Sequence, residues 1–515
     1  MHTDIPVLLF SAGAQVSTLT YETRMEFSFD FKPTGEPRLP DQAMCLLIVA
    51  NFSGEKSSGS KRKRLRSVDI DTFDDLLESI CPEITVASQS GKGTKLQVRS
   101  IDDFHPDQLY NNLPPFNELR ELRRRLKSPA TFKAAAAEIT AGLAASESAS
   151  PALASSAPPL EESADDAIER MLGRPSSPSP SSSSSESVID NLIKNLVAPH
   201  ITPGKDPQRD TLVRSIDASI STLMDQVLHT PEMQTLEARW RALFALVSNA
   251  ELDENVEIYI WDTTREDLEV MVQHPDHEPM ASGAAKLMAS INTTASWSLV
   301  ASDLSISPTD TDLIFAAKLA SITRQFGSPL LACAAPTLYG CSTSIATSAD
   351  SDEWLPATDA TLELWEQLRR APIAAWIGLV SPRLLQRMPY GAKTDPISPF
   401  NYEEFASEDH EKLLWGPASI ACASLLAGAF CERQWNMRPN DNLDIEDLPS
   451  VITNRDGQRT LMPCAEAALN DRSAEAMLAR GVMPMLSYKN RNAARLMQFQ
   501  SISVDGASLA GPWNS

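Results

Sequence analysis

Histidine and acidic side chains cluster most densely in one loop of this 515-residue sequence. His274 and His277 stand beside Asp276 and Glu278 in the run Gln-His-Pro-Asp-His-Glu. Imidazole and carboxylate donors at such spacing can hold a metal ion. A polar loop that contains proline is more often solvated surface, and we favour that interpretation. We therefore expect no metal site.

His410 is the second candidate, because Asp409 and Glu411 flank it as they would flank a general base. The residues that follow are apolar and lead to Trp415 and Gly416. This context favours a histidine that makes structural hydrogen bonds at the start of a helix.

Arg383 and Arg387 are the basic candidates, in a stretch that also holds Pro382, Pro389, Tyr390 and Gly391. Two guanidinium groups can bind an anion or pair with carboxylates. We favour ion pairs inside the protein or with a neighbouring copy. Prolines fix φ and restrict the preceding residue, so this stretch must follow a specific irregular path.

The sequence lacks the short motifs that carry common chemistry, including phosphate-binding glycine loops, the His-Glu-x-x-His zinc motif and the Gly-x-Ser-x-Gly elbow. Its seven cysteines are scattered among apolar neighbours and are expected to be free thiols in a reducing compartment. We predict no catalytic residues and no cofactor.

Charge and hydropathy exclude further classes of function. The net charge of −23 argues against a nucleic-acid-binding surface. No apolar run is long enough to cross a membrane, and the first residues do not form a secretory signal. The expected location is the cytoplasm.

Composition divides the chain into three parts. Residues 20–140 read as a small α/β module, 141–186 as a flexible linker rich in Ala, Ser and Pro, and 187–515 as a larger α/β domain. Within the linker, Leu160 to Leu172 has helical spacing and is either a docking helix or a tethered fragment.

The small module has an alternating strand at Met25–Phe31 and a fully apolar strand at Met44–Ala50. The basic run 61–66 reads as a loop. Asp71 is placed to cap a helix that has Asp74 and Asp75 in its first turn. A leucine stripe predicts a further helix over Pro115–Leu126.

The larger domain opens with three predicted helices and a strand. Apolar residues at helical spacing mark a helix from Ser187 that includes Ile189, Leu192 and Leu196, and another over Leu212–Leu228. A third begins at Pro231, a position that proline favours, and a strand follows near Asn255.

These elements carry a motif that resembles the large subunit of the type VI secretion contractile sheath. The matching positions run from His229 to Leu243 and include Trp240 and Arg241. The stretch from Trp376 to Phe405 and the Gly481 to Lys489 segment resemble the same family. Together the matches cover most of residues 187–500.

The small module resembles the other sheath subunit. The matching features are the turn at Asn51–Gly54, the Val68-Asp-Ile-Asp segment and the acidic signal before the leucine-rich helix. In that family the two subunits are separate polypeptides (TssB and TssC). Here both resemblances lie in one chain, which implies a fused protomer with the two halves in equal ratio.

The resemblance also sets an expectation for the end of the chain. The family's large subunit continues past the Tyr-Lys segment to a strand that joins neighbouring protomers, whereas this sequence stops at Ser515. Ordinary sheath polymerisation is therefore in doubt on the sequence alone.

We therefore predict an α/β structural protein of a type VI secretion apparatus that acts by assembly with itself or other sheath subunits. The resemblance extends its potential partners to the inner tube, the baseplate and the AAA+ recycling ATPase, for which the helix with Ile189, Leu192 and Leu196 is a candidate docking site. Two alternatives stay open: a non-polymerising adaptor, and an enzyme built on a sheath-like body.

Overall fold

The computed structural model describes eleven stretches of the chain. These are residues 42–55, 65–86, 93–139, 209–248, 255–273, 278–290, 296–341, 350–354, 359–405, 409–455 and 458–513. Several predictions lie outside them: the strand at 25–31, the linker at 141–186, the helix with Ile189, Leu192 and Leu196, and the pair His274 and His277.

One nine-stranded sheet organises the molecule, in the order β11-β15-β14-β8-β7-β6-β1-β5-β2. The six inner strands from β14 to β5 are parallel, and the outer three are antiparallel to their neighbours. Its strands are β1 (Met44–Ala50), β2 (Leu65–Val68), β5 (Val256–Asp262), β6 (Trp297–Ile306), β7 (Leu330–Ala334), β8 (Ile377–Ser381), β11 (Asp444–Ile445), β14 (Val482–Ser487) and β15 (Ala494–Leu496).

Strand β1 comes from the small module but lies between β5 and β6 of the larger domain. All seven of its residues are buried. Leu46 and Ile48 face one core, while Leu47 and Val49 face the core on the other side of the sheet. This alternation follows from the two-residue period of a strand. The small module thus contributes a strand to both cores of the protein.

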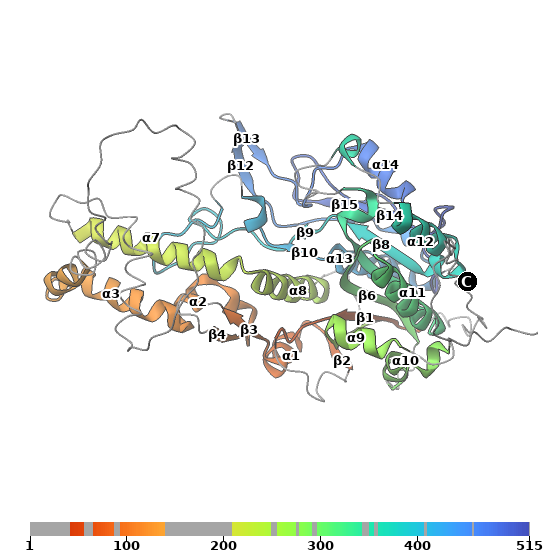
Figure 1. Cartoon of the computed structure of the whole chain (residues 1–515), viewed down its shortest axis with the longest axis horizontal. Helices are drawn as coiled ribbons and strands as arrows, with labels where there is room; N and C mark the ends of the chain where they lie inside the picture. Colours follow the sequence, from red (N-terminus) through yellow and green to blue (C-terminus); the bar gives the residue numbers. More distant parts are fainter. Residues whose placement is uncertain are drawn as a thin grey trace, which may run out of the picture.

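Helices cover both faces of the sheet and give a three-layer body (Figure 1). On one face lie α8 (Pro231–Val247) and α13 (Ala418–Arg433). The other face is covered by α9 (Arg265–Met271), α10 (Gly283–Met288), α11 (Asp310–Gln325), α12 (Asp359–Arg370) and α14 (Asp471–Ala479). Among the described residues, no helix combines the length and apolarity needed to span a membrane.

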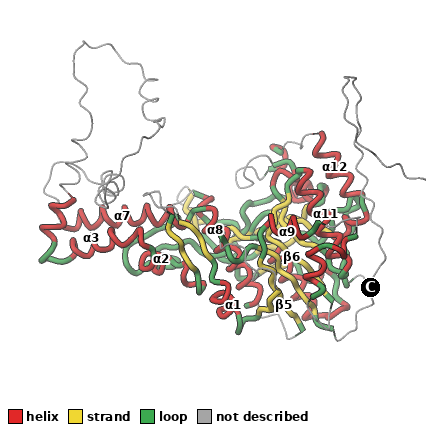
Figure 2. The backbone as a smooth tube through the Cα atoms, turned by 60° about the horizontal axis from the view of Figure 1, so that its bottom comes forward, coloured by secondary structure: helices red, strands yellow, loops and turns green. Residues whose placement is uncertain are grey.

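A helical arm extends from the body. It pairs α3 (Asn117–Lys127) of the small module with α7 (Arg209–Leu228) of the larger domain, and the two helices lie side by side in both backbone views (Figures 1 and 2). Their leucine and isoleucine stripes form a thin shared core, and Arg123 pairs with Asp217 across it. The arm therefore joins the two parts a second time.

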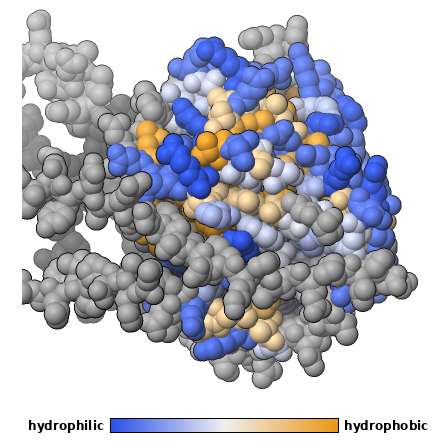
Figure 3. Space-filling model, turned by 90° about the vertical axis from the view of Figure 1, so that its right-hand side faces the viewer, coloured by the Kyte–Doolittle hydropathy of each residue, from blue (hydrophilic) through white to orange (hydrophobic). Residues whose placement is uncertain are grey.

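Smaller elements complete the fold. The small module adds α1 (Phe73–Ile80), α2 (Pro106–Asn112) and the hairpin of β3 (Glu83–Val86) and β4 (Thr94–Gln97). The larger domain adds the β9 (Leu384–Leu385) and β10 (Trp415–Gly416) pair and the hairpin of β12 (Ile452–Arg455) and β13 (Gln458–Leu461). On the body end opposite the arm, apolar side chains lie among hydrophilic ones (Figure 3).

Most predicted elements are confirmed. The helix at Pro231 begins with that proline at its first position, and β1 has the predicted range. The cap of α1 was predicted wrongly. Its N-cap is Thr72 rather than Asp71, because the carboxylate of Asp69 holds the Thr72 amide and hydroxyl and fixes the turn one residue later. Arg66 lies in β2 and not in a loop.

Candidate functional site

The stretch from Trp376 to Phe405 runs from the sheet across the first turns of α8. Strand β8 ends in a cis Ser381–Pro382 bond, and the short β9 then pairs with β10, which brings Gly416 opposite Leu384. Beyond Pro389 the chain folds back on itself, with the Gly391 amide donating to the Asp395 carbonyl at 2.9 Å. A side chain at Gly391 would overlap the Glu403 carboxylate. The irregular path is thus held by backbone contacts.

Arg387 lies at the centre of a buried ion cluster beneath this path. Its guanidinium donates to Glu404 at 2.6 and 2.9 Å and to Glu237 of α8 at 2.8 Å. Arg241, one helical turn after Glu237, donates to the same Glu237 oxygen at 2.7 Å. The Tyr390 amide completes the set with a 2.7 Å bond to Glu404. Two arginines thus neutralise two buried carboxylates.

Electrostatic pairing in this cluster overrides the effect of burial. Burial alone would lower the pKa of Arg387, but Glu237 and Glu404 hold that pKa well above its usual value. Burial alone would raise the pKa of Glu404, yet Arg387 brings it down to about 2. Both groups are therefore charged across the neutral pH range. Removal of either one would leave the other charge buried without its main partner.

Three further contacts attach the cluster and the residues beside it to the end of α7. His229, just after the end of α7, approaches Glu404 at 3.3 Å. Tyr402 donates to Asp225 at 2.5 Å, and Lys412 donates to the same carboxylate at 3.1 Å. Burial and Asp225 together raise the pKa of Tyr402. The cluster consequently connects the irregular stretch with the base of the arm.

The stretch also contacts the small module. The His105 ring meets the Tyr390 ring edge-on at 5.0 Å, and Tyr110 packs against Phe400 at 5.4 Å. The Asp107 carboxylate accepts the Ser398 amide at 3.1 Å. These contacts join α2 to the surface of the larger domain.

Trp240 on α8 makes a second, apolar contact between the larger domain and the small module. It is fully buried, and its indole nitrogen donates to the Phe52 carbonyl of the small module at 3.0 Å. The rings of Phe52 and Phe73 meet it edge-on at 5.2 and 5.7 Å. The turn after Phe52 needs Gly54, which has φ of +65° and whose absent Cβ would lie 2.6 Å from the Glu83 carbonyl oxygen.

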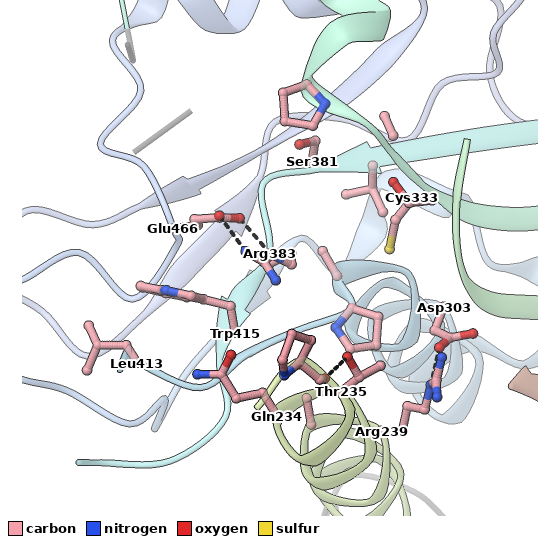
Figure 4. A pocket seen from close by; sticks show the side chains of 18 of the residues that line it. Gln234, Thr235, Arg239, Asp303, Cys333, Ser381, Arg383, Leu413, Trp415 and Glu466 are labelled. Atoms are coloured by element: carbon pink, nitrogen blue, oxygen red, sulfur yellow. Dashed lines mark hydrogen bonds and ion pairs between the residues drawn. The ribbon is translucent and has the colours of Figure 1, made fainter. Parts of the chain in front are cut away.

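A cavity of about 560 Å³ lies at the carboxyl ends of β6, β7 and β8, against the first turns of α8 (Figure 4). Its wall includes Arg383, which makes a double hydrogen bond to Glu466 at 2.6 and 2.9 Å, and Trp415. Arg239 faces Asp303 on another side. Both arginines of the cavity are therefore already paired with carboxylates.

The polar and aromatic side chains that line the cavity are held by contacts with one another. His410 stacks on Trp415 with ring centroids 4.7 Å apart, and burial lowers the pKa of its imidazole. The Cys333 thiol contacts the Ser419 hydroxyl at 3.4 Å, and burial raises its pKa, which disfavours the nucleophilic thiolate. Within the described stretches, no three His, Cys, Asp or Glu residues gather closely enough to hold a metal.

The structure thus brings the predicted residues together in two groups. The first group lies at or near the ion cluster and consists of Trp240, Arg241, Pro389, Tyr390 and Gly391. The second group lies at or beside the cavity and consists of Pro382, Arg383, His410, Trp415 and Gly416. Glu237 lies within the sheath-like motif from His229 to Leu243, but sequence reasoning assigned neither it nor Glu404 as the carboxylates that the arginines bind. The four-residue spacing of Glu237 and Arg241 on a helix was the available signal for one of them.

The fold and this site define an α/β protein of two interlocked parts, with a buried ion cluster beneath the irregular stretch. Comparison with known proteins gives the family. The model "EvpB/VC_A0108, tail sheath N-terminal domain" (VipB) matches residues 210–503, and "Type VI secretion system, VipA, VC_A0107 or Hcp2" matches residues 20–143.

The chain also resembles the type VI secretion system sheath protein TssC1 of Pseudomonas aeruginosa, with 26% identity over 303 residues. The match covers 57% of this chain and 61% of that relative. Because the VipB model alone spans more than half of the sequence, the chain belongs to the type VI secretion tail sheath family. A VipA-type module precedes the sheath domain in the same polypeptide.

Proposed function

We propose that this chain is a fused sheath protomer of a type VI secretion apparatus that acts by protein–protein assembly. The observation that carries the proposal is the position of β1. A strand from the VipA-type module lies between two strands of the VipB-type domain, so the two parts fold as one body.

Fusion gives this body a fixed composition. A covalent linker keeps the two parts in a one-to-one ratio and raises the effective concentration of each for the other. The shared sheet and the arm then transmit force between the parts through packed elements. A protomer of this kind is suited to a machine that stores and releases strain through contacts between copies.

The proposed partners are copies of this chain or separate sheath subunits in the cytoplasm. The inner tube, the baseplate and an AAA+ recycling ATPase are further proposed partners. The candidate ATPase-docking residues Ile189, Leu192 and Leu196 lie outside the described residues. We also propose that the protein is not an enzyme, which agrees with the paired arginines and the disfavoured Cys333 thiolate of the cavity.

Negative-stain microscopy of the purified full chain tests the assembly. Hollow tubes or rings formed by the chain alone are the expected result. Tubes that form only with added subunits would identify an adaptor within the same machine. Discrete particles under all conditions, with no incorporation into tubes, would refute the sheath function.

A further inference from the structure

The free end of the helical arm carries exposed positive charge. Lys127 ends α3, Lys133 follows the turn after it, and Arg209 and Arg214 lie on the first turns of α7. All four are exposed. The contact between Arg209 and the Lys127 carbonyl brings the two helix ends together. We call these four residues the basic tip.

Neighbouring arginines are already neutralised, whereas the basic tip has no such partner among the residues that the structure describes. Arg123 pairs with Asp217, Arg124 with Glu121, and Arg125 with Glu138. Arg209 and Arg214 donate instead to backbone carbonyls. In the described part of the chain, no carboxylate pairs with any of the four tip residues.

This positive charge stands out in an acidic protein. Residues 117–139 hold six basic and three acidic side chains, a local net charge of +3, while the whole chain carries −23. Evenly spread acidic charge would keep copies apart, but a basic end attracts the acidic surface of another copy. The charge distribution therefore favours a contact between different surfaces of two copies.

Helix α1 presents a complementary surface. Asp74, Asp75 and Glu78 are exposed and share the three- and four-residue spacing of one helix stripe, and Asp71 is exposed in the turn just before the helix. Beside the helix, Ile70 is 51% exposed, and Phe244, which packs against Phe73 of α1, is 41% exposed. We call the four acidic residues with Ile70 and Phe244 the α1 face. It combines negative charge with apolar area, as a docking surface does.

We propose that the basic tip of one copy docks on the α1 face of a second copy. This inference rests on the proposed sheath function and names one contact within it. The arm's end and α1 lie apart along the molecule in both backbone views, so one molecule cannot make the contact with itself (Figures 1 and 2). Two different surfaces that meet head to tail generate a ring or an open filament rather than a two-fold symmetric pair.

Charge reversal on each surface tests the contact in the full chain. The tip variant carries Lys133→Glu and Arg214→Glu, and the face variant carries Asp71→Lys and Glu78→Lys. The new carboxylates at 133 and 214 lie toward the N-terminal ends of their helices, and the new ammonium at 78 lies near the C-terminal end of α1. Each new charge therefore has the sign that the helix dipole favours. A matched control with Lys286→Glu and Lys489→Glu changes the net charge as much as the tip variant does, at exposed lysines outside both surfaces.

Self-association is measured by sedimentation velocity at low and high salt, with circular dichroism as the folding check. We expect each reversed variant to associate at least about tenfold more weakly than the control at low salt, and high salt to weaken the wild type as well. An equal mixture of the tip and face variants should recover association, because each reversed surface then meets its complement.

Three results would overturn the contact. They are variants that associate as the control does, reversed variants that do not recover when mixed, and a wild type that is monomeric at every salt concentration. In each case the sheath function is judged separately by the microscopy above. Tubes that persist with both reversed variants would leave that function standing and remove only this contact.

Discussion

Two of the seams between the small module and the larger domain are built on opposite principles. At the sheet, β1 is held by backbone ladders on both sides and buries apolar side chains toward two cores. At the irregular stretch from 387 to 404, the small module makes contact through aromatic rings and a hydrogen bond, and the ion cluster within the larger domain holds that stretch in place. The first seam is stabilised in proportion to the apolar area that it buries. The second depends on the ion cluster, in which every buried charge must keep its partner.

This difference separates stability from specificity. A strand buried on both faces drives association of the two parts but tolerates similar apolar residues. A buried ion cluster adds little net stability, yet it fails sharply when one member is missing. Substitutions at the two seams should therefore fail in different ways.

The largest effect is expected at β1. Leu46→Asp would place an unpaired carboxylate in the core, and we expect the full chain to lose its folded state. Leu46→Ala should lower the free energy of unfolding by about 2–5 kcal/mol because it leaves a cavity. Urea unfolding followed by tryptophan fluorescence measures both. An Asp variant that keeps wild-type stability would contradict the placement of β1.

The ion cluster should give a smaller and non-additive effect. Arg387→Met leaves Glu237 and Glu404 without their shared partner and should cost about 3–5 kcal/mol. When Glu404→Gln is added, part of that loss should return, because one of the buried charges is removed. A double-mutant cycle in the same unfolding assay measures the coupling. Additive losses would show that the two groups do not interact.

The pH dependence of stability tests the contribution of the Glu404 charge to the ion cluster. The pKa of Glu404 is lowered from an ordinary 4.5 to about 2, so its stabilising effect is complete above 4.5 and is lost as pH falls toward 2. In that window the unfolded chain binds up to about one more proton at this residue than the folded chain. Glu404→Gln should flatten the slope of unfolding free energy against pH there. An unchanged slope would assign the acid sensitivity to other groups.

The smallest effect is expected from cutting the linker. A protease site introduced between residues 150 and 185 allows cleavage of the folded protein. Because β1, the arm and the contacts of α2 with the irregular stretch all join the two parts, the fragments should elute together in size-exclusion chromatography at micromolar concentration. Separation of the fragments in native buffer would show that the covalent tether, and not the seams, holds the protomer together.

Local patterns predicted most individual elements. The apolar run at 44–50, the helix that begins at Pro231 and the stripe at 212–228 have the expected type and nearly the expected limits. The cap of α1 differed, because the Asp69 side chain competes for Thr72 in a way that residue type alone does not reveal. Pairings between distant residues were harder to predict, since a charged residue such as Glu404 reads as exposed until its partner is known.

The sequence by itself determined that the protein is acidic, built from two α/β parts and similar to sheath subunits over most of its length. These properties follow from composition, hydrophobic periodicity and motif order, which are local along the chain. Only the tertiary structure decided that β1 lies between β5 and β6, and that Arg387 binds Glu237 and Glu404. Such contacts join residues that are 17 to more than 200 positions apart, and chain folding, not local propensity, selects which of them form.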